Sequence, residues 1–525
     1  MKLKDVTPTA PKDQLQTLIN SMTKAEKRNF KLYAQRTQNR SQLRFIQLFD
    51  AIDKQENYDE AAIFKKIPRL SKSQLANLKR HLYKQILTSL RLIHIQKNID
   101  IEIREQIDFA RILYGKGLYL QSLRLLDRIK PLAIENNQNL LHLEIIEFQK
   151  LIEERHITRS RTIKNKVEDL IDEAAQLSSI TNNRCRLSNL KIKIHGLYIQ
   201  VGHVKNEKDL IIVKEFFKSN LQGIDIQGLS FFERVYLNQS YVWYYYILLD
   251  FEKCCKYAIE WVQLFEQHPN MIEKDPDLYM RGLHYVLTSL FNLREYDRFI
   301  GYLDRFEQFV TNKAADTTEI SKTIAFIYLA TARINKHYLE GSFTEGLQLV
   351  PGIRQNIRRY QQKLDLHRVM VFYFKIAYLY FASGDPETAL DYLNDIIDVK
   401  AGHLREDIQC YARLLLLICH FELGHYELLP YLADSTQRFL EKMKELNQAQ
   451  QETLRFLRTI INKVPSEHPT AFRTFQRNLK KISRDRFEKR AFLYLDTLTW
   501  VESKVSSQTV MEVARAGFEA GAQRK

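Results

Sequence analysis

The chain has 525 residues, a formal net charge of +16, and five cysteines that include no Cys-x-x-Cys pair. A single globular domain of this length would exceed the usual size, whereas a stack of repeats has no such limit because each unit packs only on its neighbours. Glycine (16) and proline (11) together make up only about 5% of the residues, against a usual share of about 12%. Because turn residues are rare and no stretch shows sustained strand alternation, we expect an all-α chain with long helices.

The sequence predicts neither a secretory signal nor a membrane span. The first residues, MKLKDVTPTAPKDQ, contain no apolar core. The most apolar runs, 241–249 and 414–421, are far shorter than the roughly 20 residues that cross a bilayer. Five cysteines in a chain of this length do not indicate a disulfide framework. We therefore expect a cytoplasmic protein with no membrane partner.

The positive charge is concentrated near the two ends. Residues 24–91 hold 16 Lys and Arg against 6 Asp and Glu, a net charge of +10. Residues 454–490 hold 11 against 3, a net charge of +8. The rest of the chain therefore sums to −2, so that two basic regions flank a nearly neutral middle.

The N-terminal region divides into a loosely ordered segment, 1–20, and a basic helical region, 21–98. Thr23 and Glu26 have the spacing of a capping box, which predicts a helix from Thr23 to about residue 36. Further helices are expected at 42–54 and at 59–67, where Pro68 ends the helix. Either Ser71 or Ser73 then caps a long helix that continues to about residue 95.

Helical hairpins are expected from residue 99 onward. Region 99–219 holds a first hairpin at 103–134, which turns at Gly117, and then helices at 138–156, 160–178 and 183–201. The loop at 220–230, which contains Gly223 and Gly228, is a weak candidate for a domain boundary. A hairpin array follows at 231–447, and its last helix is placed at 434–447. Basic C-terminal helices at 450–463, 466–482 and 484–504 make up region 448–505, and the tail at 506–525 is expected to fray.

The clearest hairpin is at 369–397. Its first half has Tyr373, Ile376, Ala377 and Tyr380 at helical spacing, and its second half has Ala389, Leu393 and Ile396. Gly384 can adopt positive φ, and Pro386 suits the first turn of the next helix. Comparable turns near residues 250, 294, 341, 384 and 424 are 44, 47, 43 and 40 residues apart, which is typical of a repeat array.

These residues resemble the tetratricopeptide repeat, which has large and small residues along its first helix, Gly-Asp at its turn and alanine on its second helix. Tyr373, Ile376, Ala377, Tyr380, Gly384-Asp385, Ala389 and Leu393 occupy those places, while Ala401 stands where the family has its closing proline. The stretch 103–134 fits the same pattern. The resemblance implies an α-solenoid of helical hairpins with an N-terminal helical cap, whose concave surface binds other proteins.

Some tetratricopeptide domains hold a partner's C-terminal carboxylate with Lys and Asn on the first helix. Here the matching positions are Phe374 and Tyr378, and then Leu414 and Ile418, so that clamp is missing. With Phe381 added, these residues form a candidate groove for an apolar or aromatic segment of a partner, such as a helix. The alternative is that these side chains only pack helix against helix.

The basic ends are candidate contacts for a polyanion. The candidates are Lys24, Lys27, Arg28, Lys31, Lys79, Arg80, Lys84, Arg473, Arg477, Lys480, Lys481 and Arg484. Such residues would contact phosphates of RNA or DNA without reading the base sequence. The helices around Pro68 loosely resemble a helix-turn-helix, although the second helix is about twice the usual recognition length. The alternative is a solvated basic face.

No motif of an enzyme or a cofactor site is found. The glycines match neither nucleotide-binding fingerprint, and there is no Gly-x-Ser-x-Gly or His-Glu-x-x-His motif. His420 and His425 are five residues apart, which places them on different faces of a helix, so no metal site is expected. Cys254 and Cys255 are expected to be ordinary core residues, and the aromatic run 241–246 is expected to pack between hairpins or, as an alternative, to line a groove for stacking.

Together these observations predict a non-enzymatic, cytoplasmic helical-repeat scaffold without a cofactor, which binds other proteins on its concave surface. The alternative function is a repeat protein that docks on RNA, DNA or the ribosome through its basic N-terminal and C-terminal helices.

Overall fold

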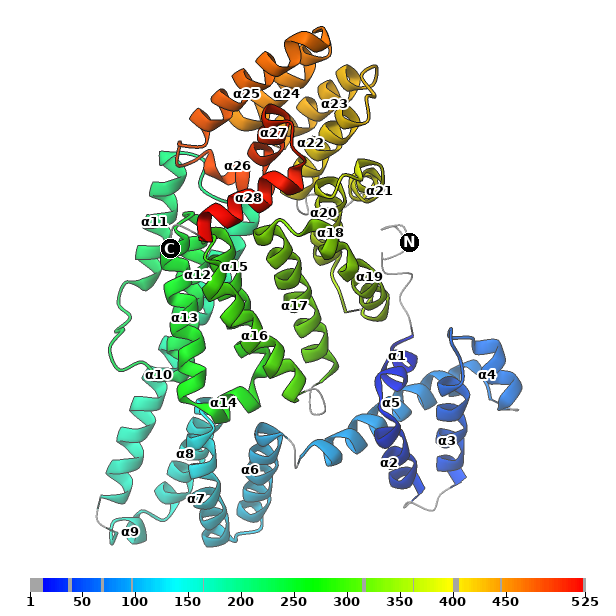
Figure 1. Cartoon of the computed structure of the whole chain (residues 1–525). Helices are drawn as coiled ribbons and strands as arrows, with labels where there is room; N and C mark the ends of the chain where they lie inside the picture. The colour runs from blue at the N-terminus through cyan, green and yellow to red at the C-terminus, as the bar shows by residue number, and fades with distance from the viewer. Residues whose placement is uncertain are drawn as a thin grey trace. The chain divides into compact units, whose positions relative to one another are not determined.

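The computed structural model describes residues 13–35, 40–67, 70–95, 98–163, 165–313, 318–361, 363–399, 406–443 and 446–522. All regular secondary structure in these ranges is helical, so the expected all-α class is confirmed (Figure 1). The described residues form two compact units that divide between residues 182 and 183. The loop 220–230, the predicted boundary, lies inside the second unit.

The N-terminal unit, residues 13–182, begins with a small helical bundle. Its helices are α1 (Gln14–Ser21), α2 (Lys24–Gln35), α3 (Arg40–Asp53), α4 (Glu60–Lys66) and α5 (Lys72–His94). The predicted capping box forms, since the Thr23 backbone N–H donates to Glu26 (2.7 Å). Ser71, one of the two candidate caps, caps α5 and forms a further capping box with Gln74. The expectation of a loosely ordered 1–20 is wrong for residues 14–20, because Asp13 caps α1, and Leu15 and Ile19 are buried in the bundle core. Residues 1–12 and Pro68 lie outside the described residues.

A run of hairpins completes this unit. Its helices are α6 (Ile99–Gly115), α7 (Tyr119–Glu135), α8 (Asn139–Arg155), the single turn α9 (Ile157–Ser160) and the first half of α10 (Lys166–Val201). The α6–α7 turn is made by Gly117 at φ 77°. The Ser122 hydroxyl donates to the Ala110 carbonyl (2.8 Å) across the hairpin. A small residue at this position lets the two helices approach closely.

Helix α10 is one helix where the sequence analysis predicts two, at 160–178 and 183–201. Its 36 residues include no proline, and its one glycine, Gly196, lies near its end. Asn182 and Asn183 are weak helix formers, but they do not break a helix whose neighbours all favour it. The division between the units therefore falls within a continuous helix.

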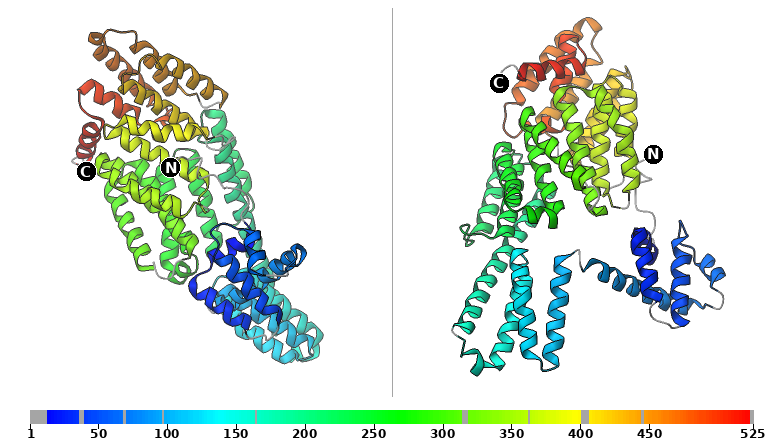
Figure 2. Two further views of the ribbon diagram at one scale, coloured as in Figure 1. Left: turned by 90° about the vertical axis from the view of Figure 1, so that its right-hand side faces the viewer. Right: turned by 60° about the horizontal axis from the view of Figure 1, so that its bottom comes forward.

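The C-terminal unit, residues 183–522, is a series of hairpins (Figures 1 and 2). We call the first helix of each hairpin an A helix and the second a B helix. The A helices are α10 from residue 183, α12 (Phe231–Ile247), α15 (Pro276–Leu293), α17 (Glu319–Glu340), α20 (Leu366–Ala382) and α22 (Glu406–Glu422). The B helices are α11 (Glu207–Leu221), α13 (Phe251–Gln267), α16 (Tyr296–Lys313), the broken helix α18–α19 (Phe343–Gly346 and Val350–Arg359), α21 (Pro386–Ile397) and α23 (Leu429–Lys442). The short helix α14 (Pro269–Lys274) joins α13 to α15. The helix predicted at 434–447 is α23, which begins and ends about one turn earlier in the sequence than predicted.

The A-to-B turns share one backbone geometry. In the five A helices from α12 to α22, a residue within two positions of the helix end is left-handed: Leu249, Arg294, Gly341, Gly384 and Gly424. The next residue donates its N–H to a carbonyl five positions earlier, as Asp385 does to Tyr380 (2.9 Å) and Glu295 to Leu290 (3.0 Å). This is the Schellman pattern, which satisfies the last carbonyls of a helix. The turns predicted near 250, 294, 341, 384 and 424 are therefore confirmed.

Small side chains lie where the two helices of a hairpin come closest. Ala389 of α21 is fully buried, and a Cβ at Gly346 of α18 would lie 3.1 Å from the Cβ of His337 on α17. Cys254 of α13 has the same position relative to its turn as Ala389 and Gly346 have to theirs. Its thiol donates to the Val242 carbonyl of α12 (3.5 Å). The successive A helices α15, α17, α20 and α22 also pack on one another, so these hairpins bury their apolar faces against the next.

The last helices return to earlier hairpins. They are α24 (Gln448–Ile460), α25 (His468–Ile482), α26 (Lys489–Tyr494), α27 (Thr497–Ser506) and α28 (Val510–Ala522). Trp500 is buried, and its indole N–H donates to Glu422 (2.6 Å). Arg294 at the α15–α16 turn pairs with Asp496 (3.4 Å). The predicted helix 484–504 thus divides into α26 and α27.

Helix α28 corrects the prediction of a frayed tail for residues 510–522. It packs on α17 and α27. The Phe518 ring contacts Tyr296 (4.7 Å between centroids), and Arg515 pairs with Glu345 (3.5 Å). The partners come from hairpins about 170–220 positions earlier, so local sequence gives no sign of them. Residues 523–525 lie outside the described part of the chain.

Candidate binding surfaces

The candidate apolar groove is filled by helix packing. Tyr378, Phe381, Leu414 and Ile418 are all buried, and Phe374 is only half-buried against the same core. Helix α20 is apolar nearly all round, and a helix of that kind is buried on most sides. The groove prediction is therefore wrong for the four buried side chains, which are not accessible to a partner.

The basic residues of the N-terminal bundle fall into two groups. Lys27 pairs with Asp53, Lys31 with Asp50, and Lys79 with Asp13 while also donating to the Tyr58 hydroxyl (2.7 Å). Because these three lysines hold helices together, they are poorer candidates for phosphate contacts than the sequence suggests.

The other four residues, which we call the α2–α5 patch, are Lys24 and Arg28 on α2 and Arg80 and Lys84 on α5. All four are exposed, and none forms an ion pair with a described residue. Helices α2 and α5 pack directly on each other. The patch therefore presents four uncompensated cations on adjacent helices.

The C-terminal candidates form the expected stripe along α25. Arg473, Arg477, Lys480 and Lys481 of α25 and Arg484, two residues after its end, are exposed, while Phe472, Phe475 and Leu479 on the other face of the helix are buried. Lys480 pairs with Glu502 (3.2 Å). The other four cations have no ion-pair partner among the described residues.

A further cationic surface lies on the A helices, and the sequence analysis does not predict it. Its centre is the ring of Tyr328 on α17, which is buried. His284 of α15 stacks on this ring, with centroids 4.1 Å apart and planes 8° apart. The Arg368 guanidinium of α20 lies 5.9 Å from the ring centroid. Arg281 of α15 lies beside the Tyr328 hydroxyl. We call Arg281, His284, Tyr328 and Arg368 the Tyr328 cluster.

Cations and aromatic rings extend from this cluster along neighbouring A helices. On α10, His195 stacks on Trp243 (4.2 Å) and the Lys191 ammonium lies 4.7 Å from the centroid of Tyr236. On α20, the Lys375 ammonium donates to Asn335 (2.7 Å) and lies 5.0 Å from the ring of Tyr338. We call this surface, with the Tyr328 cluster at its centre, the A-helix face.

The charges of the A-helix face perturb one another. Burial and the positive charges of Arg368, Arg281 and Lys375 lower the pKa of His284 to about 3. Burial lowers the pKa of Lys375 to about 8. For Lys191, burial and then Arg281 lower the pKa. Yet these groups keep part of their surface in contact with solvent. These charged groups are therefore partly buried but still accessible to solvent, as at a recognition surface.

Few acids are placed to neutralise this face. Residues 183–201 and α20 contain no acid, and the only acids of α12 and α15 are Glu233 and Asp277, both in a first helical turn. Lys191, Arg281, Arg368 and Lys375 form no ion pair with any described residue. Asp275, the acid near Lys191 and Arg281, caps α15 by accepting from the Leu278 N–H (3.1 Å). The depletion of acids from these helices is the signal in the sequence that could have revealed the surface.

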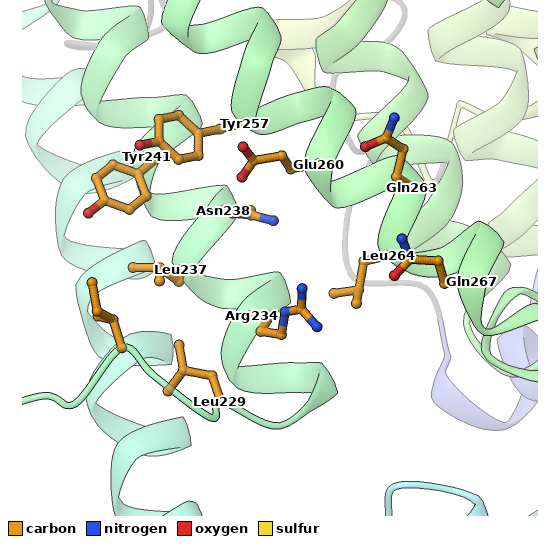
Figure 3. Close-up of a pocket in the computed structure, with 11 residues that line it drawn as sticks. Leu229, Arg234, Leu237, Asn238, Tyr241, Tyr257, Glu260, Gln263, Leu264 and Gln267 are labelled. Atoms are coloured by element: carbon orange, nitrogen blue, oxygen red, sulfur yellow. The ribbon is translucent and has the colours of Figure 1, made fainter.

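A cleft with a volume of about 340 Å³ lies between α12 and α13. The rings of Tyr241 and Tyr257 stack beside it, 4.3 Å apart, while Arg234 and Gln267 line it farther along (Figure 3). The aromatic run 241–246 thus packs mainly ring on ring, as in the stack of Tyr244 on Phe217 (4.1 Å). A second cleft, about 190 Å³, lies in the N-terminal unit between α7, α8 and α10.

The cysteines and histidines singled out in the sequence lie as follows. Cys254 and Cys255 are free and buried, and burial raises their thiol pKa values to about 12 and about 11. His420 and His425 do meet, with their Nδ1 atoms 3.0 Å apart, because Gly424 reverses the chain between them. The expectation that they point apart is wrong. Within the described ranges, no group of three or more His, Cys, Asp or Glu side chains is close enough to hold a metal ion.

The comparisons with known proteins add no relative. No protein-family model, curated protein or solved structure matches the chain at a significant level. In addition, no helix in the described ranges is both long and apolar enough to cross a membrane. The case for a function therefore depends on the surfaces described above.

Proposed function

We propose that the chain is a non-enzymatic scaffold of the cytoplasm, a tetratricopeptide-like α-solenoid that binds another protein on its A-helix face. The observation that carries this proposal is the A-helix face itself: uncompensated cations and aromatic rings from α10, α12, α15, α17 and α20 gather on one surface. In a hairpin array, each A helix adds one row of side chains to a continuous surface, which suits it to an extended partner. In this proposal the partner binds the polar A-helix face and not the apolar groove predicted from the sequence, whose side chains are buried.

The shared turn geometry supports the repeat part of the proposal. Five successive hairpins end their A helices in a left-handed residue, and several place a small residue at the same point of the B helix. Such regularity is typical of stacked supersecondary units, which bury a continuous core while leaving one face for binding.

A pull-down from cells tests the proposal. The full chain would be captured with an affinity tag, with and without nuclease, alongside the double variant Lys191→Glu and Arg368→Glu. We expect protein partners that survive nuclease and are absent from the capture with the double variant. Partners that disappear with nuclease, or none at all, would contradict the proposal.

A second function, binding of RNA or DNA, is favoured by the α2–α5 patch and the α25 stripe. Reversing Lys24, Arg28, Arg80 and Lys84 to Glu should weaken binding to RNA or DNA of any sequence, because phosphate contacts carry no base identity. On duplex DNA, the slope of log affinity against log salt should become shallower by about 0.9 for each phosphate that the variant no longer neutralises. Lys79 is left unchanged because it holds Asp13 and Tyr58. If the wild type binds neither RNA nor DNA at about 50 mM salt, this second function is excluded.

A further inference from the structure

We infer that the Tyr328 cluster recognises the carboxylates of an acidic, Asp- or Glu-rich segment of the partner protein. This inference depends on the proposed function, since it requires the A-helix face to bind a protein. It specifies the chemistry of the partner segment and the residues of this chain that recognise it.

The cluster has the geometry of a carboxylate site. Two guanidinium groups, Arg281 and Arg368, and the imidazole of His284 surround a single buried tyrosine ring. A guanidinium binds a carboxylate with two parallel hydrogen bonds. Cations that are partly removed from water and repel one another gain most from an added anion.

Elsewhere in the array, cations are neutralised by acids from the neighbouring hairpin. Arg305 pairs with Glu266 (2.6 Å) and Arg333 with Glu307 (2.7 Å). The hairpins thus readily supply counter-charges between neighbours. The A-helix face receives no such ion pair, and the nearby Asp275 already caps α15, so these cations remain incompletely neutralised and would gain from an anion of another molecule.

The stretches of this sequence outside the described residues are poor in acids. The terminal stretches outside the described residues read MKLKDVTPTAPK and QRK, and both are basic. The internal stretches outside them, such as AADT at 314–317 and KAGHLR at 400–405, contain at most one acid each. A partner protein is therefore the better source of several carboxylates.

An acidic protein segment fits the face better than a nucleic acid does. Binding of single strands needs open aromatic faces on which bases stack. Here a cation or imidazole already covers a face of each ring: His284 on Tyr328, His195 on Trp243, and Lys375 on Tyr338. The face therefore offers charge rather than a stacking platform, whereas the more exposed cations of the α25 stripe are better placed for a phosphate backbone.

Binding of defined peptides by the purified full chain tests the inference. The probe is a fluorescein-labelled peptide of eight Glu-Gly repeats, and the matched probe has Gln in place of Glu. Fluorescence anisotropy should show binding of the Glu peptide, weakened by salt, and at least tenfold weaker binding of the Gln peptide. Lack of binding of the Glu peptide would overturn the inference.

Two double variants locate the site. Arg281→Gln with Arg368→Gln should weaken binding of the Glu peptide at least tenfold. Arg473→Gln with Arg477→Gln removes the same charge from α25 and should change it less than twofold. Equal weakening by both would show a general charge effect and overturn the inference.

The folding of the Arg281→Gln and Arg368→Gln double variant is checked by tryptophan fluorescence during urea unfolding. Because the cations of the Tyr328 cluster repel one another, this variant should fold at least as well as the wild type. If that variant unfolds, Arg281→Lys with Arg368→Lys takes its place, because it keeps the charge. It should still weaken binding of the Glu peptide severalfold, since lysine cannot bind a carboxylate with two parallel hydrogen bonds. Unchanged binding would overturn the inference.

Competition and pull-down separate the remaining outcomes. A 16-nucleotide oligo-dT or inorganic phosphate should displace the Glu peptide less well than unlabelled Glu peptide does. If oligo-dT displaces it better, the face reads phosphates and the inference is wrong. If partners survive nuclease but bind the Arg281 and Arg368 double variant as tightly as the wild type, the inference fails while the proposed function stands. If the wild type captures no such partner, the proposed function fails.

Discussion

Single residues decide how each hairpin turns. Gly384 adopts φ 93°, and nothing lies within 4 Å of where its Cβ would be. A substitution there therefore adds backbone strain but no clash. Gly301 of α16 also has open space around a Cβ, but its backbone is helical. The two positions form a matched pair that isolates backbone conformation.

We expect Gly384→Ala to destabilise the C-terminal unit by about 1 kcal/mol, because a left-handed residue with a Cβ costs roughly that much. Gly301→Ala should stabilise it by about 0.5–1 kcal/mol through helix propensity. All three tryptophans, Trp243, Trp261 and Trp500, lie in this unit, so their fluorescence during urea unfolding reports on it. If the free energy of unfolding changed in the same direction for both variants, that result would contradict a left-handed conformation at Gly384.

His203 makes stability depend on pH. It is buried, its Nδ1–H donates to the Tyr246 carbonyl (2.9 Å), and burial lowers its pKa from 6.5 to about 4. Between these values the unfolded chain binds more protons, so the free energy of unfolding should fall as the pH drops. The contribution of His203 is up to about 3 kcal/mol between pH 6.5 and 4. His203→Asn should flatten the profile over this range in urea unfolding, and parallel profiles would contradict the prediction.

Helix-scale packing depends on small residues at the hairpin crossings. Ala389 is fully buried on α21, whereas Ala175 is exposed on α10. We expect Ala389→Glu to cost several kcal/mol or to prevent folding, because it places a charge between packed helices. The matched Ala175→Glu should change stability by less than about 0.5 kcal/mol. Equal urea midpoints for Ala389→Glu and the wild type would show that this crossing is not packed as described.

Helix α28 docks against a glycine. A Cβ at Gly341 would lie 2.6 Å from the backbone nitrogen of Arg515, so no side chain fits without moving α28. We expect Gly341→Ala to release α28 and to cost more than Gly384→Ala, which shares the left-handed strain without the clash. Hydrogen exchange should show reduced protection at residues 510–522 in Gly341→Ala alone. Unchanged protection there would contradict the close approach.

At the scale of the whole molecule, local patterns predict helices and turns well and surfaces poorly. Gly341, Gly384 and Gly424 mark turns because positive φ is a local requirement. The burial of Tyr378 and Leu414, by contrast, depends on neighbouring hairpins. The Tyr328 cluster joins residues 281, 328 and 368, each about 40–47 positions from the next, so no short motif contains it. Helix α28 likewise depends on partners that lie far away in the sequence.

The central claim is that the A-helix face binds a protein partner, and site-directed photocrosslinking tests it most directly. A benzophenone amino acid would replace His195, which is exposed on the A-helix face, or Tyr431, which is 72% exposed on α23. In cells, the His195 position should crosslink to a protein partner, and the Tyr431 position should not. Crosslinking at both positions, at Tyr431 alone, or at neither would contradict the account.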